Sequence, residues 1–600
     1  MGKGKTSGNG AGPDAKRRRL LKIGGAVGVG GAVGGTAVLT ALFPHSAHTQ
    51  AMRHHRTPVQ TDTAARWLTK FVDRLEIPST ITPSSTPSGV PFYDVKMRPF
   101  QEKLHRDLPP TALWGYNAMY PAPTFEVRRG RPIAVKWENN LPGRHFLPID
   151  PTIHGAEPPT PDVRTVVHLH GQKDMPDSDG YPEAWFTNGF RQTGPFFTTQ
   201  TYHYPNDQQA TGLWYHDHAL GITRLNNYAG LGGGNYFIRD DHEDSLDLPE
   251  GRYEIPLTIQ DRFFNSDGSL LYPVQAPNRG GDPDTRVPPI WIPEFFGDTV
   301  LVNGRVWPFL EVEPRKYRFR ILNASNARVY RMTLQESTDT GQLLGRPGPV
   351  FHQIGSDGGL LPAPVTRTQL LIAPAERQDV VIDFSGFKGK SFVLTNDAPA
   401  PFPDGADIVP PDIMVFKVNQ PLQGQDRSRL PATLNTVPLI SPASSVKTRD
   451  LVLSELDSAP PFGNPIMAMI NDAHWSDPIT ETPKAGSIEI WRIINTTGDA
   501  HPIHVHLVQF QVLDRQPFDT TQYPPNLVFT GAPQPPENNE RPAWKDTIIS
   551  YPGTVTRIIS KFDLPPGANA RPGQKFLYVF HCHILEHEEN EMMRPYEVVG

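Results

Sequence analysis

The sequence has almost no cysteine, since Cys582 is the single one among 600 residues. A disulfide needs two thiols, so an intrachain disulfide framework is excluded. The chain also lacks a strong charge of one sign: its formal net charge is −6 at pH 7, which gives no electrostatic reason to expect a nucleic-acid partner. The weakly apolar stretch from Ile23 to Phe43 is diluted by seven glycines, and we therefore expect no stable membrane span.

Turn-forming residues are abundant, with 65 prolines and 51 glycines. This composition favours short strands joined by many turns over long helices. A chain of this length is too long for one core, because domains average roughly 150 residues. We therefore predict an all-β protein of three domains with few, short helices. The segment ALGITRLNNYAG, which follows His218, is the strongest helix candidate.

The N-terminal residues 1–50 have the layout of an export signal and linker. A polar, Gly-rich start leads into KRRRLLK at 16–22, and an apolar segment and small residues follow. Arg17 and Arg18 resemble the pair of a twin-arginine export motif. We predict export to the periplasm, the cell surface or the medium; the alternative is a disordered basic tail.

A weak internal repeat supports three domains. Three segments each carry a proline, an alternating strand pattern and a closing asparagine before a turn. They read PTFEVRRGRPIAVKWENN from Pro123, PFLEVEPRKYRFRILN from Pro308 and PITETPKAGSIEIWRIIN from Pro478. With boundaries in polar, Pro-rich stretches, the predicted domains are 51–245, 246–430 and 431–600.

Four His-x-His pairs are the most informative motifs in the chain. With 21 histidines, roughly one such pair is expected by chance, so four are significant. On a strand, residues i and i+2 project from the same face, so each pair presents two imidazoles to a common site. Eight buried imidazoles need partners, and metal ions are the obvious ones. The pairs are His168/His170, His216/His218, His504/His506 and His581/His583.

The segment HCH at 581–583 predicts two different metal sites. Its two histidines lie on one face of an extended strand, and Cys582 lies on the other. In the segment HPIHVH, His501 has the opposite parity from the His-x-His pair and can join Cys582. With His587 and Met592 this makes a His2Cys set with a weak axial methionine, which is typical of a blue-copper centre and not of structural zinc.

Taken together, the chain resembles the multicopper oxidases, in particular the bacterial spore-coat laccase type, with bilirubin oxidase and phenoxazinone synthase as relatives. The resemblance runs from about residue 85 to the C-terminus. It implies three cupredoxin-like Greek-key β-barrel domains, with a trinuclear copper cluster between the first and the third. Residues 246–430 contain one histidine, His352, which agrees with a copper-free middle domain. The motifs are VVHLHG (166–171), DSDGYPEAWF (177–186), LWYHDHALGITRLNNYAGLGG (213–233), HPIHVHLVQF (501–510) and HCHILEHEENEMMRP (581–595).

The resemblance also implies four copper ions and the ligands of each. The type 1 ligands are His501, Cys582, His587 and Met592. For the methionine, the alternatives are the neighbouring Met593 and a role in packing alone. The type 2 ligands are His168 and His504. One type 3 copper is expected on His170, His216 and His581, and the other on His218, His506 and His583. Because Cys582 is covalently continuous with both flanking histidines, an electron can pass from its sulfur to either type 3 copper.

Two acids match positions that serve proton delivery in this family. Reduction of O2 to water consumes protons, so a buried cluster needs a carboxylate or water route to solvent. The resemblance assigns this role to Glu588, as the acid of the oxygen channel, and to Asp179, which interacts with the type 2 site through water. A surface glutamate and a turn-forming aspartate are the alternatives.

The function expected is a laccase-like oxidase of phenols, aromatic amines or tetrapyrroles that reduces O2 to water. Its partners would be small molecules and O2, and the chain a monomer. Oxidation of Cu(I) or Fe(II) calls for a methionine-rich insert or an acidic patch that binds the metal ion. Met467 and Met469 are too few to indicate a copper-docking site. A coat or electron-carrier role stays open. Zinc hydrolysis does not account for Cys582, a simple carrier would not need eight further imidazoles, and a copper nitrite reductase lacks the paired type 3 pattern.

Overall fold

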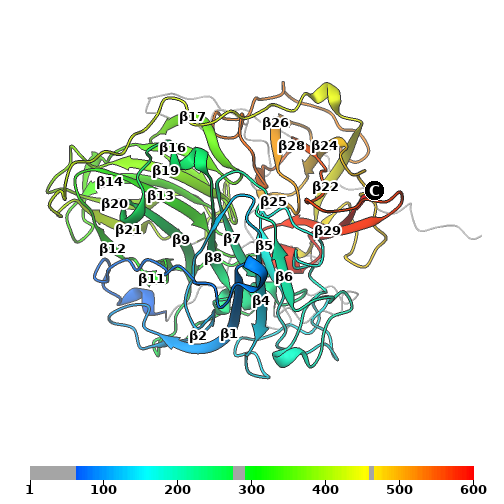
Figure 1. The fold of residues 1–600 in the computed structure, drawn as a ribbon, viewed down its shortest axis with the longest axis horizontal. Coiled ribbons are helices and arrows are strands. Elements are labelled where there is room, and N and C mark those ends of the chain that lie inside the picture. Colours follow the sequence, from blue (N-terminus) through cyan, green and yellow to red (C-terminus); the bar gives the residue numbers. More distant parts are fainter. Residues whose placement is uncertain (1–62, 275–290, 408, 458–464) are drawn as a thin grey trace, which may run out of the picture. The chain divides into compact units, whose positions relative to one another are not determined.

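A computed structural model describes residues 63–274, 291–407, 409–457 and 465–600, so the predicted export signal lies outside the described residues. Strands dominate these ranges (Figure 1), and the all-β prediction is confirmed. The helix expected after His218 is present as the first helix, and no helix within the described ranges is long and apolar enough to cross a bilayer. The α-helices are α1 (Thr223–Ala229), α2 (Asp241–Asp244) and α3 (Leu585–Glu589).

The first block of strands forms two four-stranded sheets. The sheet in the order β2-β1-β4-β6 contains β1 (Phe92–Glu102), β2 (Thr111–Tyr116), β4 (Ile133–Asn139) and β6 (Thr201–Tyr204). The sheet in the order β3-β8-β7-β5 contains β3 (Phe125–Arg128), β5 (Val167–His170), β7 (Thr211–Asp217) and β8 (Gly232–Arg239).

The middle block also forms two sheets. The order β11-β10-β9-β13-β19-β16-β17 joins β9 (Glu254–Arg262), β10 (Thr299–Val302), β11 (Arg305–Val306), β13 (Lys316–Asn323), β16 (Phe351–Ser356), β17 (Gly359–Arg367) and β19 (Arg377–Asp383). The order β12-β21-β20-β14-β15 joins β12 (Phe309–Glu311), β14 (Tyr330–Ser337), β15 (Leu343–Pro347), β20 (Ser391–Asn396) and β21 (Asp412–Lys417), with β18 (Leu370–Ile372) beside β14.

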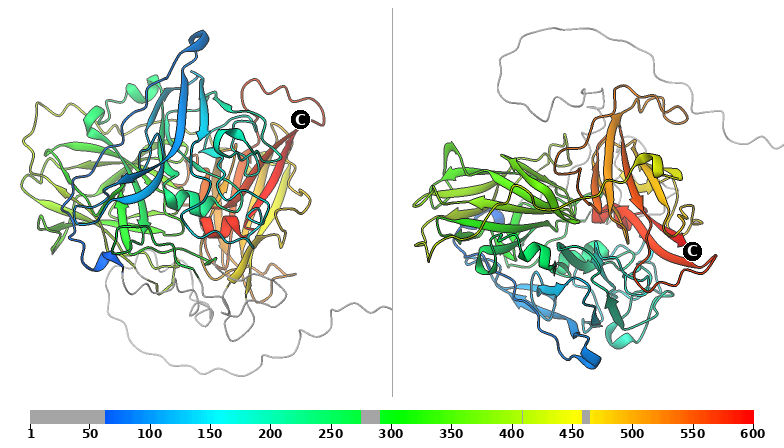
Figure 2. Two further views of the ribbon diagram at one scale, coloured as in Figure 1. Left: turned by 90° about the horizontal axis from the view of Figure 1, so that it is seen from below. Right: turned by 45° about the horizontal axis from the view of Figure 1, so that its top comes forward.

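The last block repeats the two-sheet plan. The order β23-β22-β24-β28-β26 joins β22 (Lys447–Asp457), β23 (Pro465–Ile470), β24 (Ile488–Asn495), β26 (Phe510–Pro517) and β28 (Thr554–Lys561). The order β27-β25-β29-β30 joins β25 (His501–Val505), β27 (Thr547–Ser550), β29 (Lys575–Cys582) and β30 (Met593–Val599). Every one of these sheets takes its strands from a single predicted domain, as the colours of Figure 2 allow the reader to follow. The domain boundaries themselves stay a prediction.

The sequence repeat is also a structural repeat. Its strands β4, β13 and β24 each pair in parallel with the first strand of their block, β1, β9 or β22. Each also pairs antiparallel with a later strand, β6, β19 or β28. The alternating pattern of apolar residues therefore specifies the same central strand three times.

The closing asparagine of each repeat has the same structural role. Asn139, Asn323 and Asn495 are buried at the ends of β4, β13 and β24. Each side-chain oxygen accepts a hydrogen bond from the backbone N–H two residues further on, at 3.0, 3.0 and 2.9 Å. Each side-chain amide donates to a backbone carbonyl elsewhere in the chain. The asparagine thus ends the strand and stabilises the turn that follows.

Candidate metal centre

Two strand pairs, one from the first block and one from the last, carry the His-x-His motifs. In the first, β5 runs antiparallel to β7 with His168 opposite His216. In the last, β25 runs antiparallel to β29 with His504 opposite His581. Both histidines of the first pair lie on β5, whereas His218, His506 and His583 directly follow the last residues of β7, β25 and β29.

Rings from the two blocks are in contact. The imidazoles of His168 and His506 stack with centroids 3.7 Å apart, and those of His170 and His504 stack at 3.6 Å. The Nε2 atom of His581 lies 3.3 Å from Nε2 of His506 and 3.3 Å from Nε2 of His218, which belongs to the first block. The eight histidines therefore form one buried cluster. Four come from the first block and four from the last, and the two sets are more than 280 residues apart in the sequence.

Within this cluster the ligand atoms form overlapping triads in which all atoms lie within 4.8 Å of one another. They are His168/His170/His504, His170/His216/His583 and His218/His506/His581. In the last two, His581 and His583 stand in each other's place relative to the type 3 sets that the family resemblance implies, and the assignment of ligands stays a proposal. β29 ends at Cys582, and the backbone N–H of His583 donates to the carbonyl of Pro502, so strand parity does not fix the direction of this ring.

Several buried nitrogens of the cluster have no hydrogen-bonding partner among the described residues. They include Nε2 of His168, His216 and His504, Nδ1 of His170, and both ring nitrogens of His583. All of these rings are 0–1% exposed, so water at the surface cannot satisfy them. An unsatisfied buried nitrogen is costly, and metal ions would remove that cost. The residues present therefore fit a metal cluster.

Hydrogen bonds to carbonyls fix which nitrogen each ring presents. Nδ1 of His168 lies 2.6 Å from the carbonyl oxygen of Asp179, and Nδ1 of His504 lies 2.8 Å from that of Asp546. Nδ1 of His216 lies 2.9 Å from the carbonyl of the following residue. A carbonyl only accepts, so the proton is on Nδ1 and the lone pair is on Nε2, as a metal ligand requires.

The same environment keeps the rings neutral. Burial lowers the pKa of His216 to about 3. Burial, and then the neighbouring imidazoles, hold the pKa values of His168, His170 and His504 well below the usual range. Neutral imidazoles offer lone pairs to a metal ion at physiological pH.

The two predicted acids lie against these rings. An Asp179 carboxylate oxygen is 2.8 Å from Nδ1 of His506. The two oxygens of Glu588 are 3.3 Å from Nδ1 of His218 and 3.1 Å from Nδ1 of His581. Both acids are buried. Glu588 therefore contacts the eight-histidine cluster although it follows His587 in the sequence.

A second centre lies on the other face of β29. Sγ of Cys582 is 3.6 Å from Nδ1 of His501 and 3.9 Å from Nδ1 of His587, and the two Nδ1 atoms are 3.2 Å apart. Burial raises the pKa of the Cys582 thiol well above its usual value, so a cation is needed to hold the thiolate. Nε2 of His501 bonds to the Thr497 hydroxyl at 2.6 Å, which leaves Nδ1 facing the sulfur.

Met592 belongs to the same apolar cluster as Cys582 and is fully buried. Its carbonyl accepts a hydrogen bond of 3.0 Å from the backbone N–H of Cys582, and its own N–H donates to the carbonyl of His587 at 2.9 Å. The backbone of Met592 is thus tied to two of the residues with which it is expected to share a metal.

Some polar residues at the two centres were not identified from the sequence. The Asp499 carboxylate lies 3.4 Å from Nε2 of His501. Burial, and then Asp499, raise the pKa of Glu294 well above its usual value, and the same two causes raise that of Glu455. Asp546 contacts the ring of His170 as well as that of His504. Isolated acids in loops carry no spacing signal, so only the fold brings them to the metal ligands.

The site is matched by known proteins. A family model described as multicopper oxidase matches residues 448–599. The laccase of Bacillus subtilis (strain 168) is 48% identical over 539 residues, which cover 88% of this chain and 99% of that protein. This chain belongs to the multicopper oxidase family. Like the rest of the family, this oxidoreductase uses copper and couples oxidation of a substrate to O2.

Other relatives of this multicopper oxidase agree in fold and extent. The multicopper oxidase LPR1 of Arabidopsis thaliana is 38% identical over 528 residues, which cover 83% of this chain and 87% of that protein. The crystal structure of the McoA multicopper oxidase from Aquifex aeolicus is similar with a TM-score of 0.67 and 26% identity, covering 88% of this chain and 99% of that one. A multicopper oxidase structure from Pediococcus acidilactici gives 0.66 and 26%, covering 88% and 93%. The predicted cupredoxin-like fold is thereby confirmed.

Proposed function

We propose that this multicopper oxidase is a laccase-like enzyme that takes electrons one at a time from phenols, aromatic amines or tetrapyrroles and uses four of them to reduce O2 to water. One observation carries the proposal. Cys582 contacts His501 and His587 on one face of β29, while its chain neighbours His581 and His583 belong to the eight-histidine cluster on the other. A donor site and an acceptor site are thus joined by three consecutive residues of the chain.

Four copper ions are proposed, and they would supply the one-electron redox couples and the site for O2. His501, Cys582, His587 and Met592 would hold type 1 copper, and His168 with His504 would hold type 2 copper. The triads of the structure support His170, His216 and His583 for one type 3 copper and His218, His506 and His581 for the other. The donor sets agree with the metal, because thiolate, thioether and imidazole are ligands that suit copper.

The chain itself provides a short path between the two centres. Cys582 is bonded through the backbone to His581 on one side and to His583 on the other. These two histidines belong to different triads, so the connection from the sulfur branches to both. No side-chain rearrangement is needed to link the site that accepts electrons with the site that uses them.

Protons are proposed to reach the cluster through Asp179 and Glu588. Four protons are consumed for each O2 reduced to two waters, and the cluster histidines are buried. Asp179 bonds to the ring of His506, and Glu588 contacts the rings of His218 and His581. Each carboxylate can hold a proton beside the cluster without being one of the proposed copper ligands.

The cellular setting is also proposed. We infer export through the twin-arginine signal within residues 1–50, three domains at 51–245, 246–430 and 431–600, and a monomeric enzyme. The absence of a bilayer-spanning helix among the described residues is compatible with this setting. Separation of the exported protein by size, with its mass determined, would test the monomer.

The function is tested by following O2 uptake with bilirubin, dimethoxyphenol, o-aminophenol, Fe(II) and Cu(I). The organic donors should be oxidised with one O2 consumed for every four electrons. Cys582→Ser is the control, because it removes the proposed electron acceptor and leaves the eight histidines. Oxidation of the organic donors that continues in this variant, or that proceeds without O2 uptake, would contradict the proposal.

Oxidation of a metal ion is a second candidate, because acids gather beside the type 1 site. Asp499 lies against His501, and Glu294 and Glu455 interact with Asp499. If this group receives Fe(II), Glu455→Gln should lower the rate with Fe(II) and leave the rate with dimethoxyphenol unchanged. Equal effects on both donors would exclude a separate role in metal oxidation.

A further inference from the structure

One buried ion pair links the copper-free middle block to the last block. The guanidinium of Arg377, at the start of β19, binds both carboxylate oxygens of Asp546, at 2.7 and 2.5 Å. Arg377 is 6% exposed and Asp546 is fully buried. A bidentate pair of this kind fixes the plane of the carboxylate as well as its position.

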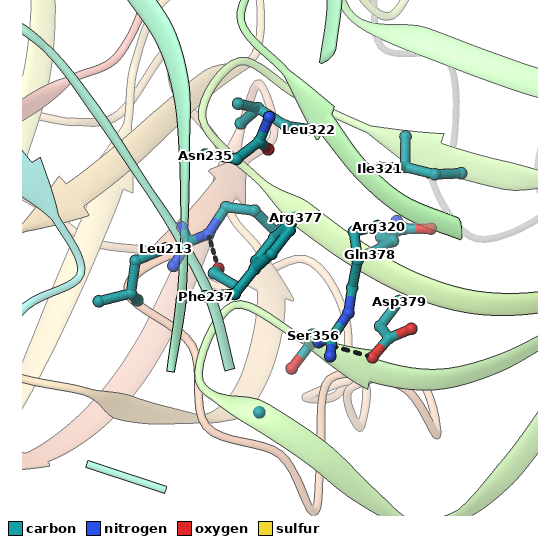
Figure 3. A pocket seen from close by; sticks show the side chains of 12 residues that line it. Leu213, Asn235, Phe237, Arg320, Ile321, Leu322, Ser356, Arg377, Gln378 and Asp379 are labelled. Atoms are coloured by element: carbon teal, nitrogen blue, oxygen red, sulfur yellow. Dashed lines mark hydrogen bonds and ion pairs between the residues drawn. The ribbon is translucent and has the colours of Figure 1, made fainter. Parts of the chain in front are cut away.

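Every N–H of this guanidinium has an acceptor. Beyond the two bonds to Asp546, it donates to the carbonyls of Gly212, Ala375 and Asp357, each at 3.1 Å. Arginine has five such N–H groups, so none remains for any other partner. The carbonyl of Gly212 belongs to β7, which carries His216. Figure 3 shows the Arg377 side chain among residues of the first and middle blocks that line a small cavity.

Asp546 in turn contacts two histidines of the cluster. Its side-chain oxygen lies 3.1 Å from Nε2 of His170, and its carbonyl lies 2.8 Å from Nδ1 of His504. An ionised carboxylate only accepts, so the proton of His170 is on Nε2 and its lone pair is on Nδ1. This is the opposite of His504, His168 and His216, which keep their proton on Nδ1. Nδ1 of His170 is buried without a hydrogen-bonding partner in the part of the chain described.

The backbone next to His170 is shaped to this pair. Gly171 has φ +88°, and a Cβ there would lie 2.5 Å from an Asp546 carboxylate oxygen and 2.8 Å from Nη2 of Arg377. Only glycine allows both the left-handed conformation and this close approach. The HLHG motif is therefore fitted to the ion pair as well as to the metal site.

We propose that Arg377 is a positioning residue of the trinuclear centre: it holds Asp546 so that His170 presents Nδ1 and His504 presents Nε2 to copper. This inference rests on the proposed function. It concerns Arg377 and Asp546, which are not among the proposed copper ligands. It gives the middle block, which supplies no copper ligand, a defined task at the cluster. Partners that hold the second nitrogen of a metal-binding histidine typically change metal affinity or activity by about 10- to 100-fold.

A neighbouring ion pair provides a matched control. Lys545 and Glu376 directly precede Asp546 and Arg377, and Nζ of Lys545 lies 3.0 Å from Glu376 and 2.9 Å from Asp357. This pair joins the same two blocks and is equally buried. Lys545 makes no hydrogen bond to a cluster histidine in the described structure. Lys545→Gln therefore removes one buried charge from the same interface without touching His170 or His504.

The experiment compares copper-loaded wild type, Arg377→Gln, Asp546→Asn and Lys545→Gln. Copper per chain is measured after dialysis against graded chelator, together with the blue absorption of type 1 copper and the electron paramagnetic resonance signal of type 2 copper. Arg377→Gln and Asp546→Asn should lose trinuclear copper at a chelator concentration about 10- to 100-fold lower than wild type. Both variants should also alter the type 2 signal. Their blue absorption should be unchanged, and combining them should add little, because both act on one unit.

Lys545→Gln should lower the thermal unfolding midpoint and leave copper retention and the type 2 signal as in wild type. If it loses cluster copper as readily as Arg377→Gln, the interface alone matters and the positioning role is wrong. Wild-type copper retention in Asp546→Asn, which is isosteric, would also overturn it. His170→Ala distinguishes failure of the proposed function from failure of this inference. If His170→Ala keeps all its copper, the proposed function is wrong. If His170→Ala loses copper while Arg377→Gln retains it as in wild type, only the positioning role is refuted.

Discussion

The carboxylate of Glu588 lies 3.3 Å from Nδ1 of His218, although its chain neighbour His587 contacts Cys582 at the other centre. Both residues belong to the short helix α3, where successive side chains point about 100° apart. One turn of helix therefore serves two centres. A change at Glu588 should consequently affect one centre and leave the other intact.

Glu588→Leu should slow reoxidation of the reduced enzyme by O2 much more than it slows bleaching of the blue colour by substrate. A positioned acid or base typically contributes about 100- to 10,000-fold. Rapid mixing without O2 measures bleaching, and later addition of O2 measures reoxidation. Glu586→Gln is the control on the same helix, because Glu586 bonds to Tyr272 and Asn326 instead of a histidine. Slower bleaching with normal reoxidation would place Glu588 on the substrate side.

Cys582→Ser should abolish both the blue colour and oxidase turnover. The colour of type 1 copper arises from the thiolate, and serine offers no sulfur. The substituted side chain is small and lies at the end of β29, so most of the fold should be retained. Absorption spectra, O2 uptake and circular dichroism test the three statements separately. A variant that stays blue would exclude Cys582 as the type 1 ligand.

Met592→Leu should raise the reduction potential of type 1 copper and leave copper bound. Loss of a weak axial donor destabilises Cu(II) relative to Cu(I), while His501, Cys582 and His587 remain. Leucine is also close to methionine in volume, so the apolar cluster around residue 592 should repack at little cost. Redox titration of the blue band gives the potential. An unchanged potential would mean that Met592 only fills space.

Glu540→Gln should make the enzyme less stable at neutral pH but should matter less in acid. Glu540 is paired with both terminal nitrogens of Arg515, at 2.8 and 2.7 Å. Burial opposes its ionisation, but Arg515 outweighs burial and lowers the pKa of Glu540 to about 2. A carboxylate whose pKa is lowered in the folded state stabilises the protein at pH values above the pKa of the unfolded chain, near 4.3. This contribution to the free energy of unfolding is at most about 3 kcal/mol, and it is lost as the pH falls toward about 2. Unfolding midpoints of wild type and variant should therefore converge between about pH 4.5 and 2, and a constant difference would contradict the pairing.

Replacing Arg17 and Arg18 together by lysine should leave the precursor in the cytoplasm. The substitution keeps the charge and removes the arginine pair that the export motif requires. Cell fractionation with an antibody against the mature protein locates the product. Normal export of the variant would instead indicate a general secretory signal or a tail without an export role.

The sequence predicted the parts of the site that depend on strand parity. The alternation of side chains across a strand places Cys582 opposite its flanking histidines, and the structure has His501 beside the sulfur. Parity does not specify which of several rings meet in space. The groups of ligand atoms in the structure place His581 and His583 differently from the sets that the family resemblance implies, because His583 lies beyond the end of β29 and its backbone N–H donates to Pro502.

Residues that act through the fold left no trace in the sequence. Arg377 begins β19, whose sequence RQDVVID is buried almost throughout, and Asp546 stands in a loop 169 residues away, so neither forms a motif with the other. Their pairing depends on how the middle block meets the last one. The prediction that the middle block lacks copper ligands agrees with its single histidine. It gave no indication that Arg377 of this block binds Asp546 beside the metal-binding strands.

The asparagine that closes a central strand three times also bears on how the molecule arose. Asn139, Asn323 and Asn495 share one backbone bond pattern, as expected if a single ancestral unit was copied twice. The Cys582 centre lies within one copy, whereas the eight-histidine cluster is divided between the first and third copies. A single copy therefore contains every proposed ligand of the electron-accepting centre, while the centre proposed to reduce O2 needs two copies in one molecule.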